Sequence, residues 1–227
     1  MGICSDFIRL KNGISRINIK IRADKESEIN SQGPLITDDE LEQLIAKTGQ
    51  ISDGDTIVLA GSIPASAADD TYERILRSLE GKNVCIVVDA AKKLLLSCLP
   101  YRPFLIKPNR QALSELFGRE ISGEKETELC ARELMRQGAQ NVIVSLGEDG
   151  AVLFADDGKT YRSGTLKEDV QSPVGSGDSM IVGFIAGFMQ HGDYGYALRL
   201  GTACGNATAF SKGLAGKDKI YEVLGKM

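Results

Sequence analysis

Short apolar runs alternate with longer amphipathic stretches along most of the chain. The apolar runs, rich in β-branched and aliphatic residues, predict buried strands at 56–60, 84–89, 104–107 and 141–145. Helical periodicity predicts helices at about 37–48, 69–79, 111–117, 124–137, 194–210 and 219–226. A hairpin is expected from 151–154 to 160–162, around Asp157-Gly158. This alternation favours an α/β fold, with a mostly parallel sheet flanked by helices.

Two local patterns fix where particular helices begin. Thr37 followed by Glu40 fits a capping box, in which each side chain satisfies a backbone N–H of the other residue. Gly175-Ser176-Gly177-Asp178 opens a helix of small residues that runs to about Gln190. Two glycines let the backbone turn tightly and approach a ligand, and the first turn of a helix attracts anions.

Asp178 is expected in that first turn. There the helix dipole keeps its carboxylate ionised, so that it can accept a proton. An anion-binding loop beside a fixed base is what phosphoryl transfer to a hydroxyl requires. An ordinary loop with a helix cap gives the same short string, so the four residues alone leave both interpretations open.

Residues 16–22 alternate between apolar and polar side chains. The three isoleucines point one way and the polar residues the other, which predicts a half-buried strand with a basic face and a partner strand near 28–30. A sheet with one solvated face would give this pattern, and so would a face that binds phosphate. The basic face consists of Arg16, Asn18, Lys20 and Arg22.

Composition narrows the class of protein. The chain has 227 residues, of which 42% are hydrophobic and 26% charged, as expected of one globular domain. The net charge of −4 argues against nucleic acid as a partner. No apolar run is long enough to cross a bilayer and no signal peptide is recognisable, so we expect no membrane association and a cytoplasmic location. Five scattered cysteines without a CxxC pair suit a reducing compartment, and the single histidine, His191, argues against a Ser-His-Asp site.

Five motif regions, in the same order along the chain, resemble the ribokinase-like PfkB carbohydrate kinases. The 175–178 segment resembles the family's Gly-Ala-Gly-Asp signature, with Ser176 in place of alanine. The resemblance implies that the amides of Gly175, Ser176 and Gly177 form an anion hole and that Asp178 is the catalytic base and contacts the substrate. It further implies a ribokinase-like fold over residues 1–227, with small β lid strands at about 14–34.

The resemblance also assigns residues to the substrate. Ser15-Arg16-Ile17-Asn18 resembles the Thr-Arg-x-Asn lid strand of phosphosugar kinases, which implies that Arg16 clamps a phosphate, with Asn18 beside it. Gly61-Ser62-Ile63-Pro64 resembles a Gly-Ser-Leu-Pro stretch, and Ser62 then contacts the same phosphate. Asp89, at a strand end, either touches substrate or caps the next helix. Pairing of two chains through the lid would give a homodimer.

The remaining motif regions imply an ATP site. Lys107-Pro108-Asn109 resembles the family's Lys-Pro-Asn-x-x-Glu motif, but Ala112 stands where the family has a glutamate that organises Mg²⁺. We therefore expect Mg²⁺ to bind mainly through the phosphates of ATP. Residues 145–150 resemble a loop along the nucleotide, and the small-residue helix at 201–214 resembles one wall of the adenine pocket, although small residues also serve close packing. The ATP-site residues implied are Lys107, Asn109, Ser145, Gly147, Gly150 and Asn206.

The branch of the family most like this chain contains the bacterial 1-phosphofructokinases. It implies ATP-dependent phosphorylation of fructose 1-phosphate to fructose 1,6-bisphosphate, with tagatose-6-phosphate kinase and 6-phosphofructokinase as alternatives. The family's N-terminal portion, with a sugar-binding aspartate and a Gly-Gly-Lys-Gly segment, has no counterpart here. The resemblance thus implies an N-terminally truncated chain, and a catalytically impaired nucleotide-binding fragment is the alternative of another class. The sequence leaves open which phosphosugar is used and how many chains assemble.

Overall fold

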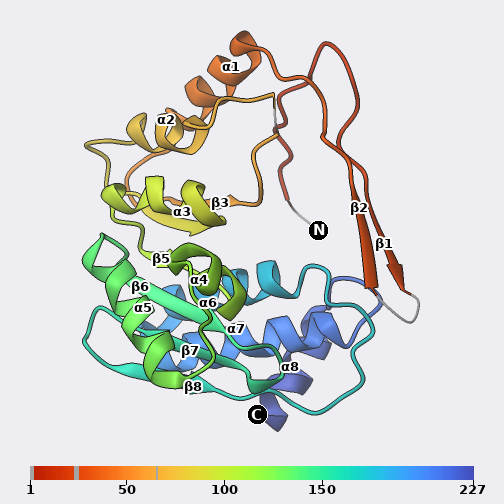
Figure 1. Ribbon diagram of the computed structural model, residues 1–227, viewed down its shortest axis with the longest axis vertical. Coiled ribbons are helices and arrows are strands. Elements are labelled where there is room, and N and C mark those ends of the chain that lie inside the picture. Colours follow the sequence, from red (N-terminus) through yellow and green to blue (C-terminus); the bar gives the residue numbers. More distant parts are fainter. Residues whose placement is uncertain (1–2, 23–25, 65) are drawn as a thin grey trace. The chain divides into compact units, whose positions relative to one another are not determined.

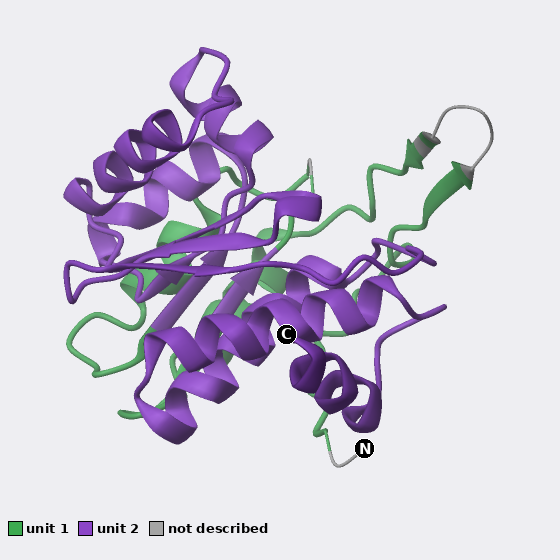
Figure 2. Cartoon of the chain, turned by 90° about the horizontal axis from the view of Figure 1, so that it is seen from below, with its two compact units in different colours: residues 1–57, 61–85 green, residues 58–60, 86–227 purple. Residues whose placement is uncertain are grey.

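The computed structural model describes residues 3–22, 26–64 and 66–227 (Figure 1). Its contacts divide the chain into two compact units (Figure 2). Unit 1 comprises residues 1–57 and 61–85, and unit 2 comprises residues 58–60 and 86–227. That residues 1–227 form one domain stays a prediction. Residues 23–25 of the predicted lid lie outside the described residues.

Unit 1 holds a two-stranded antiparallel sheet and two helices. Strands β1 (Asn18–Arg22) and β2 (Glu26–Asn30) run side by side, with Ile19 opposite Ile29 (Figure 1). β1 begins at Asn18, so Arg16 precedes the strand that alternation placed it in. The expected burial of the isoleucine face is wrong for this chain, because Ile17, Ile19, Ile21 and Ile29 are between 45% and 62% exposed. A two-stranded sheet has no third strand or second layer of its own to cover that face.

The helices of unit 1 are α1 (Asp38–Thr48) and α2 (Thr71–Arg77). The predicted capping box of α1 is confirmed, because the Glu40 carboxylate accepts from the Thr37 amide at 2.9 Å and the Glu40 amide donates to the Thr37 hydroxyl at 3.4 Å. Backbone hydrogen bonds, the strongest from Thr37, hold the pKa of Glu40 below its usual value. The start of α1 is therefore specified locally.

The central sheet has six strands in the order β3-β4-β5-β6-β7-β8. β4, β5 and β6 are parallel, while β6, β7 and β8 are antiparallel neighbours, as the predicted hairpin requires. The middle strands consist mostly of buried apolar residues, which is typical of a sheet with both faces covered. The strands are β3 (Thr56–Ala60), β4 (Cys85–Asp89), β5 (Leu105–Ile106), β6 (Asn141–Ser145), β7 (Ala151–Phe154) and β8 (Thr160–Ser163).

Helices of unit 2 cover both faces of its strands (Figure 2). On one face α5 packs against β6 and β7, and on the other α7 packs against β7 and β8. The expected α/β fold with helices on both faces of the sheet and a small antiparallel sheet near the N-terminus is confirmed. These helices are α3 (Lys92–Cys98), α4 (Arg110–Phe117), α5 (Glu124–Arg136), α6 (Ser176–His191), α7 (Tyr194–Ala209) and α8 (Lys217–Lys226).

Small residues let α6 and α7 pack closely. A Cβ at Gly183 would lie 2.6 Å from the Cys204 sulfur, and one at Gly201 would lie 2.7 Å from the Met180 carbonyl oxygen. Both distances are below van der Waals contact, so these glycines are required by helix packing. Gly201 thus serves packing, one of the two interpretations that the sequence allowed for the small residues at 201–214.

Two further expectations concern cysteines and the membrane. All five cysteines are free, and Cys98, Cys130 and Cys204 are buried, whereas Cys4 is exposed. Among the described residues, the helices are all too short or too polar to cross a membrane.

Candidate active site

The predicted anion loop lies at the start of α6. Gly175 is the N-cap residue, with a left-handed backbone at φ 80°, and Asp178 lies in the first helical turn, where the sequence placed it. A side chain at Gly175 would be strained by this φ, and its Cβ would lie 2.8 Å from Leu214 Cδ2. The turn into α6 therefore needs glycine for its own geometry.

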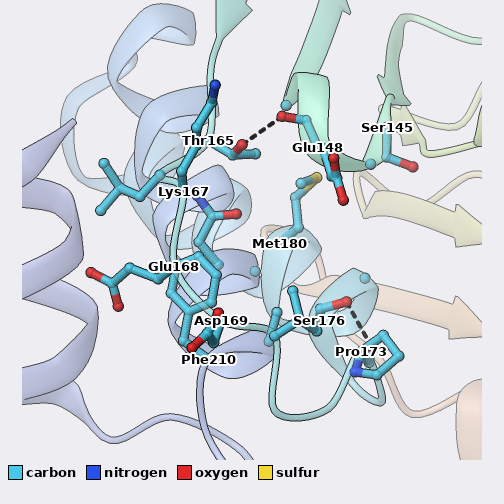
Figure 3. A pocket seen from close by; sticks show the side chains of 18 of the residues that line it. Ser145, Glu148, Thr165, Lys167, Glu168, Asp169, Pro173, Ser176, Met180 and Phe210 are labelled. Atoms are coloured by element: carbon cyan, nitrogen blue, oxygen red, sulfur yellow. Dashed lines mark hydrogen bonds between the residues drawn. The ribbon is translucent and has the colours of Figure 1, made fainter.

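Two of the three predicted amide donors are available to a ligand. The Ser176 amide donates to the Pro173 carbonyl oxygen at 3.2 Å, and its hydroxyl donates to the same oxygen at 2.7 Å (Figure 3). Among the residues that the structure describes, the amides of Gly175 and Gly177 have no protein acceptor. The loop therefore offers an anion two N–H groups together with the positive end of α6.

A buried ion pair lies against this loop. Lys107 Nζ is 3.4 Å from Asp89 Oδ2, and the side chains of Lys107 and Asp89 are only 9% and 23% exposed. A Cβ on Gly177 would lie 3.2 Å from Lys107 Nζ, so the ammonium sits directly beside the loop. The absence of a side chain at Gly177 gives the Lys107 charge access to any anion bound there.

Asp89 belongs to the same charge cluster. Burial raises the pKa of Asp89, the Lys107 charge opposes that rise, and the charge of Asp178 adds to it. The alternative that Asp89 caps the next helix is wrong, because Ala91 is the N-cap residue of α3. Three charged groups, Asp89, Lys107 and Asp178, thus surround the start of α6.

The loop forms part of the lining of a cavity of about 750 Å³ (Figure 3). Small-molecule sites occupy about 300–1,000 Å³, so this cavity has the size for a nucleotide. It brings together predicted residues from four separate segments of unit 2. These are Asn109, Ser145, Gly147, Gly150, Ser176, Gly177 and Asn206.

Several of these residues also have structural roles. Asn109 caps α4, because its Oδ1 accepts from the Ala112 amide at 2.7 Å. The Ser145 amide donates to the Pro108 carbonyl oxygen at 3.2 Å, which joins two strand-end loops at the cavity. A Cβ at Gly150 would lie 2.0 Å from the Ser163 carbonyl oxygen, so this glycine is needed for packing against β8.

Asn206 contributes an unsatisfied donor to the cavity lining. It is 9% exposed, and within the described part of the chain its Nδ2 has no hydrogen-bond partner. A buried amide without a partner costs free energy, which a ligand acceptor would recover.

Unit 1 carries the predicted phosphate clamp. Arg16 Nη1 donates to Ser62 Oγ at 2.9 Å, although the two residues are 46 positions apart in the chain. Asn18 pairs with Asn30 at the start of β1, two residues beyond Arg16. Arg16 and Ser62 are both exposed and thus open to a ligand. The structure thereby joins two side chains that the sequence connected only through the resemblance.

Sequence reasoning missed part of the cavity lining. Residues 165–170 line the cavity and lie outside every motif that we recognised, whereas Glu148, Met180 and Phe210 lie in recognised regions but were not assigned to the site. Residues 165–170 form neither helix nor strand, so no periodicity marked them. The position of this segment directly before the anion loop was the one available signal. Among the described residues there is no group of three or more histidine, cysteine, aspartate or glutamate side chains that could hold a metal.

An α/β fold with an anion loop, a buried lysine and a nucleotide-sized cavity is the arrangement of a phosphotransferase. The profile of the family described as pfkB family carbohydrate kinase matches residues 2–219. The chain belongs to this family.

Individual relatives agree with this assignment. The chain is 39% identical over 212 residues to the 1-phosphofructokinase of Bacillus subtilis (strain 168), covering 93% of this chain and 70% of that protein. It is 36% identical over 219 residues to the D-tagatose-1-phosphate kinase of Bacillus licheniformis, covering 96% and 71%. The structure of Arabidopsis thaliana ribokinase with ribose and ATP matches with a TM-score of 0.69 at 19% identity, covering 92% of this chain and 69% of that one, which shows the ribokinase-like fold.

Proposed function

We propose that the chain is an ATP-dependent phosphosugar kinase that converts fructose 1-phosphate to fructose 1,6-bisphosphate. The observation that carries this proposal is the position of the Lys107 ammonium beside Gly177 of the anion loop, which lies on the lining of a nucleotide-sized cavity. The substrate follows from the similarity to the 1-phosphofructokinase of Bacillus subtilis. Tagatose 1-phosphate is a second candidate substrate because of the similarity to the Bacillus licheniformis kinase.

The proposed reaction forms a bond between the sugar hydroxyl oxygen and the γ-phosphorus and breaks the bond from that phosphorus to the bridging oxygen of ADP. Asp178 accepts the hydroxyl proton. The amides of Gly175 and Gly177, with Lys107, stabilise the negative charge on the transferring group. The Ser176 amide, which our sequence analysis also assigned to this role, contributes only if it exchanges Pro173 for the ligand.

ATP is proposed to occupy the cavity of unit 2. Lys107 and Asn109 then lie on its phosphate side, and Ser145, Gly147 and Gly150 lie along the nucleotide. Asn206 donates its unpaired Nδ2 hydrogens to an acceptor on the nucleotide. This assignment is supported by the cavity, which these residues share except for Lys107, whose ammonium reaches the loop at Gly177.

Mg²⁺ is proposed to arrive with ATP. The ion prefers oxygen ligands and keeps several waters, and Ala112 offers no side-chain oxygen at the motif position where the family has glutamate. Glu115, three residues further along α4, already contacts Lys92 at 3.4 Å and Gln111 at 3.1 Å. We therefore expect Ala112→Glu to lower the Mg²⁺ concentration that gives half-maximal activity. Identical Mg²⁺ titrations for variant and parent would contradict this role of position 112.

The phosphate already on the sugar is proposed to bind Arg16 and Ser62. A guanidinium that donates to a neighbouring hydroxyl is oriented in advance, and its planar fork suits phosphate oxygens. Asn18 is proposed to contact the same substrate from the start of β1.

We also propose that two chains pair through the lid. The isoleucines of β1 and β2 form an exposed apolar row that a second copy would cover. Ile19→Lys should then shift the chain towards monomer in sedimentation velocity. An unchanged sedimentation profile would contradict pairing through this row.

The experiment that tests the proposed function joins two assays on the same protein. Calorimetry measures binding of Mg²⁺-ATP, and a coupled assay measures ADP release with fructose 1-phosphate, tagatose 1-phosphate, tagatose 6-phosphate or fructose 6-phosphate. Turnover that is fastest with fructose 1-phosphate supports the proposal. ATP binding without turnover on any of these sugars would favour a nucleotide-binding chain without kinase activity.

A further inference from the structure

The cavity lining includes a segment with no regular structure of its own. Residues 165–170, which we call the wall segment, all line the cavity and belong to neither helix nor strand. Its ends are held by hydrogen bonds, since Thr165 Oγ1 donates to the Glu148 carbonyl oxygen at 2.6 Å and the Gln171 amide donates to the Ala209 carbonyl oxygen at 2.8 Å. An irregular segment needs such ties to keep one conformation.

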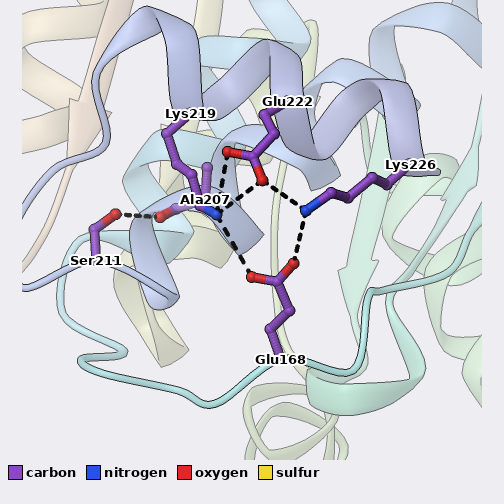
Figure 4. A network of polar contacts seen from close by, with 6 residues as sticks. All are labelled: Glu168, Ala207, Ser211, Lys219, Glu222 and Lys226. Carbon is purple, nitrogen blue, oxygen red and sulfur yellow. Dashed lines mark hydrogen bonds and ion pairs between the residues drawn. The ribbon is translucent and has the colours of Figure 1, made fainter.

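Glu168 ties the middle of the wall segment to α8 (Figure 4). Its Oε1 lies 3.3 Å from Lys226 Nζ, and its Oε2 lies 3.6 Å from Lys219 Nζ. Both lysines also contact Glu222, at 2.6 Å from Lys226 and 3.4 Å from Lys219. No ion pair involves Lys167 or Asp169 in the part of the chain that the structure describes, so Glu168 is the charged tie of this segment there.

α8 presents these lysines as a preformed pair. Lys219 and Lys226 lie two turns apart, on one face of the helix, and Glu222 lies between them at the spacing that lets helical side chains interact. Hydrogen bonds from the two lysines lower the pKa of Glu222, which keeps the network charged. The Glu168 carboxylate therefore meets two cations whose positions are already set.

α8 is itself anchored to the helix that forms another part of the cavity lining. Val223 and Leu224 are buried in one apolar cluster with residues of α7, and Leu166 of the wall segment packs against the same cluster. Arg199 of α7 donates to the Leu224 carbonyl oxygen at 3.1 Å. The wall segment is thus held in two ways: Leu166 packs against the apolar cluster of α7 and α8, and Glu168 pairs with the lysines of α8.

We propose that Glu168 is a positioning residue for nucleotide binding: its ion pairs with Lys219 and Lys226 hold the wall segment in the conformation that receives the nucleotide. This inference rests on the proposed function, in which ATP occupies the cavity. It makes nucleotide affinity depend on α8, a helix that contributes no residue to the cavity lining.

The first test compares two neutralising variants that remove a single charge. Glu168→Gln keeps the size of the side chain and removes both ion pairs, so we expect the Kd for Mg²⁺-ATP to rise about 2- to 5-fold, since partly exposed pairs contribute little each. The kcat at saturating ATP and the KM for fructose 1-phosphate should not change. Lys217→Met is the matched control, because Lys217 lies on α8 over the Tyr221 ring and makes no ion pair with the wall segment among the described residues.

A mutant cycle asks whether Glu168 acts through the lysines. Lys219→Met with Lys226→Met leaves Glu168 unpaired beside an anionic ligand, so this double variant should weaken ATP binding more than Glu168→Gln does. Adding Glu168→Gln to the double variant should then weaken binding no further. Additive losses would show that Glu168 acts independently of α8 and would overturn the inference.

Hydrogen exchange separates positioning from general stability. In Glu168→Gln the amides of residues 164–172 should exchange faster without ATP, while the rest of unit 2 exchanges as in the parent. If the parent binds no ATP, the proposed function fails. If the parent binds ATP and Glu168→Gln binds it equally well, the proposed function stands and the inference fails.

Discussion

The two places that the sequence assigned to phosphate groups are built in opposite ways. In unit 2 the Lys107 side chain is only 9% exposed, pairs with Asp89 and lies beside Gly177, where an added Cβ would come within 3.2 Å of its ammonium. In unit 1 Arg16 and Ser62 are exposed, and the hydroxyl that Arg16 contacts is neutral. Burial of the Lys107–Asp89 ion pair costs desolvation free energy and fixes both side chains. The exposed Arg16 and Ser62 side chains lose little hydration free energy and stay free to adjust to a ligand.

The two arrangements suit different proposed tasks: phosphoryl transfer at the α6 loop and recognition of the substrate's phosphate at Arg16 and Ser62. Charge that develops during a reaction is best stabilised by groups fixed in a dry environment, which suits the α6 loop. A phosphate that is already present needs only recognition, for which an exposed and oriented guanidinium is sufficient.

The largest effect is expected at Asp178. Asp178→Asn removes the proposed base while keeping the shape of the side chain, so kcat should fall about 10²- to 10⁴-fold. The Kd for Mg²⁺-ATP, measured by calorimetry, should change little. Asp169→Asn is the control, since Asp169 is an exposed carboxylate of the cavity lining without a proposed chemical role. Equal loss of ATP binding in Asp178→Asn would contradict its role as base.

Arg16→Ala should lower kcat/KM for fructose 1-phosphate about 10- to 150-fold, because a hydrogen bond to a charged group contributes about 1.5–3 kcal/mol. Steady-state kinetics with fructose should show almost no change. Ser62→Ala, which removes the hydroxyl that orients Arg16, should have a smaller effect in the same direction. Equal losses for fructose and fructose 1-phosphate would mean that Arg16 supports the lid rather than the ligand.

Gly177→Ala tests the contact between the loop and Lys107. The added methyl would lie 3.2 Å from Lys107 Nζ and displace the ammonium, so kcat should fall by up to about 10²-fold, as small misplacements in active sites do. Stability should not fall, because alanine favours helix over glycine by about 1 kcal/mol. Gly175→Ala should instead lower the Tm, because its backbone is left-handed. Full activity in Gly177→Ala would contradict the proposed role of Lys107 in stabilising the charge on the transferring phosphoryl group.

The smallest effect concerns the pH dependence of stability. Burial raises the pKa of Asp89 in the folded chain, so the unfolded chain loses this proton first as the pH rises. Stability from this group is present at acidic pH and declines as the pH passes through its folded pKa. As the pH rises from acidic towards neutral values, the Tm of the parent should therefore fall relative to the Tm of Asp89→Asn, which has no carboxyl group to titrate at this position. If the Tm of the parent instead rises relative to that of the variant, the Lys107 charge lowers the pKa of Asp89 by more than burial raises it.

The sequence predicted features that depend on neighbouring residues. The Thr37–Glu40 capping box, the hairpin around Asp157-Gly158 and the position of Asp178 in the first turn of α6 are all set within a few residues. The order of strands and helices followed from apolar runs in the same way. Such local patterns are readable from the sequence because local preferences and the global fold agree in natural proteins.

Features that depend on tertiary contacts were not predictable in this way. The closeness of Lys107 to Gly177 and the place of Glu168 in the cavity lining arise from segments that are distant in the chain. The short helix α3 was not predicted, and it begins at Lys92, whose φ of 53° is unusual for a residue other than glycine. The exposure of the isoleucines on β1 depends on what covers that strand, which alternation alone does not reveal.

We propose that the α6 loop and Asp178 transfer a phosphoryl group from ATP to a phosphosugar. Phosphorus NMR of a mixture of Mg²⁺-ATP and fructose 1-phosphate, with the parent and with Asp178→Asn at equal concentration, tests it most directly. We predict that the parent produces ADP and fructose 1,6-bisphosphate in equal amounts, and that Asp178→Asn, which still binds ATP, forms neither on the same time scale. ADP and inorganic phosphate without the bisphosphate, or equal rates for the two proteins, would contradict the account.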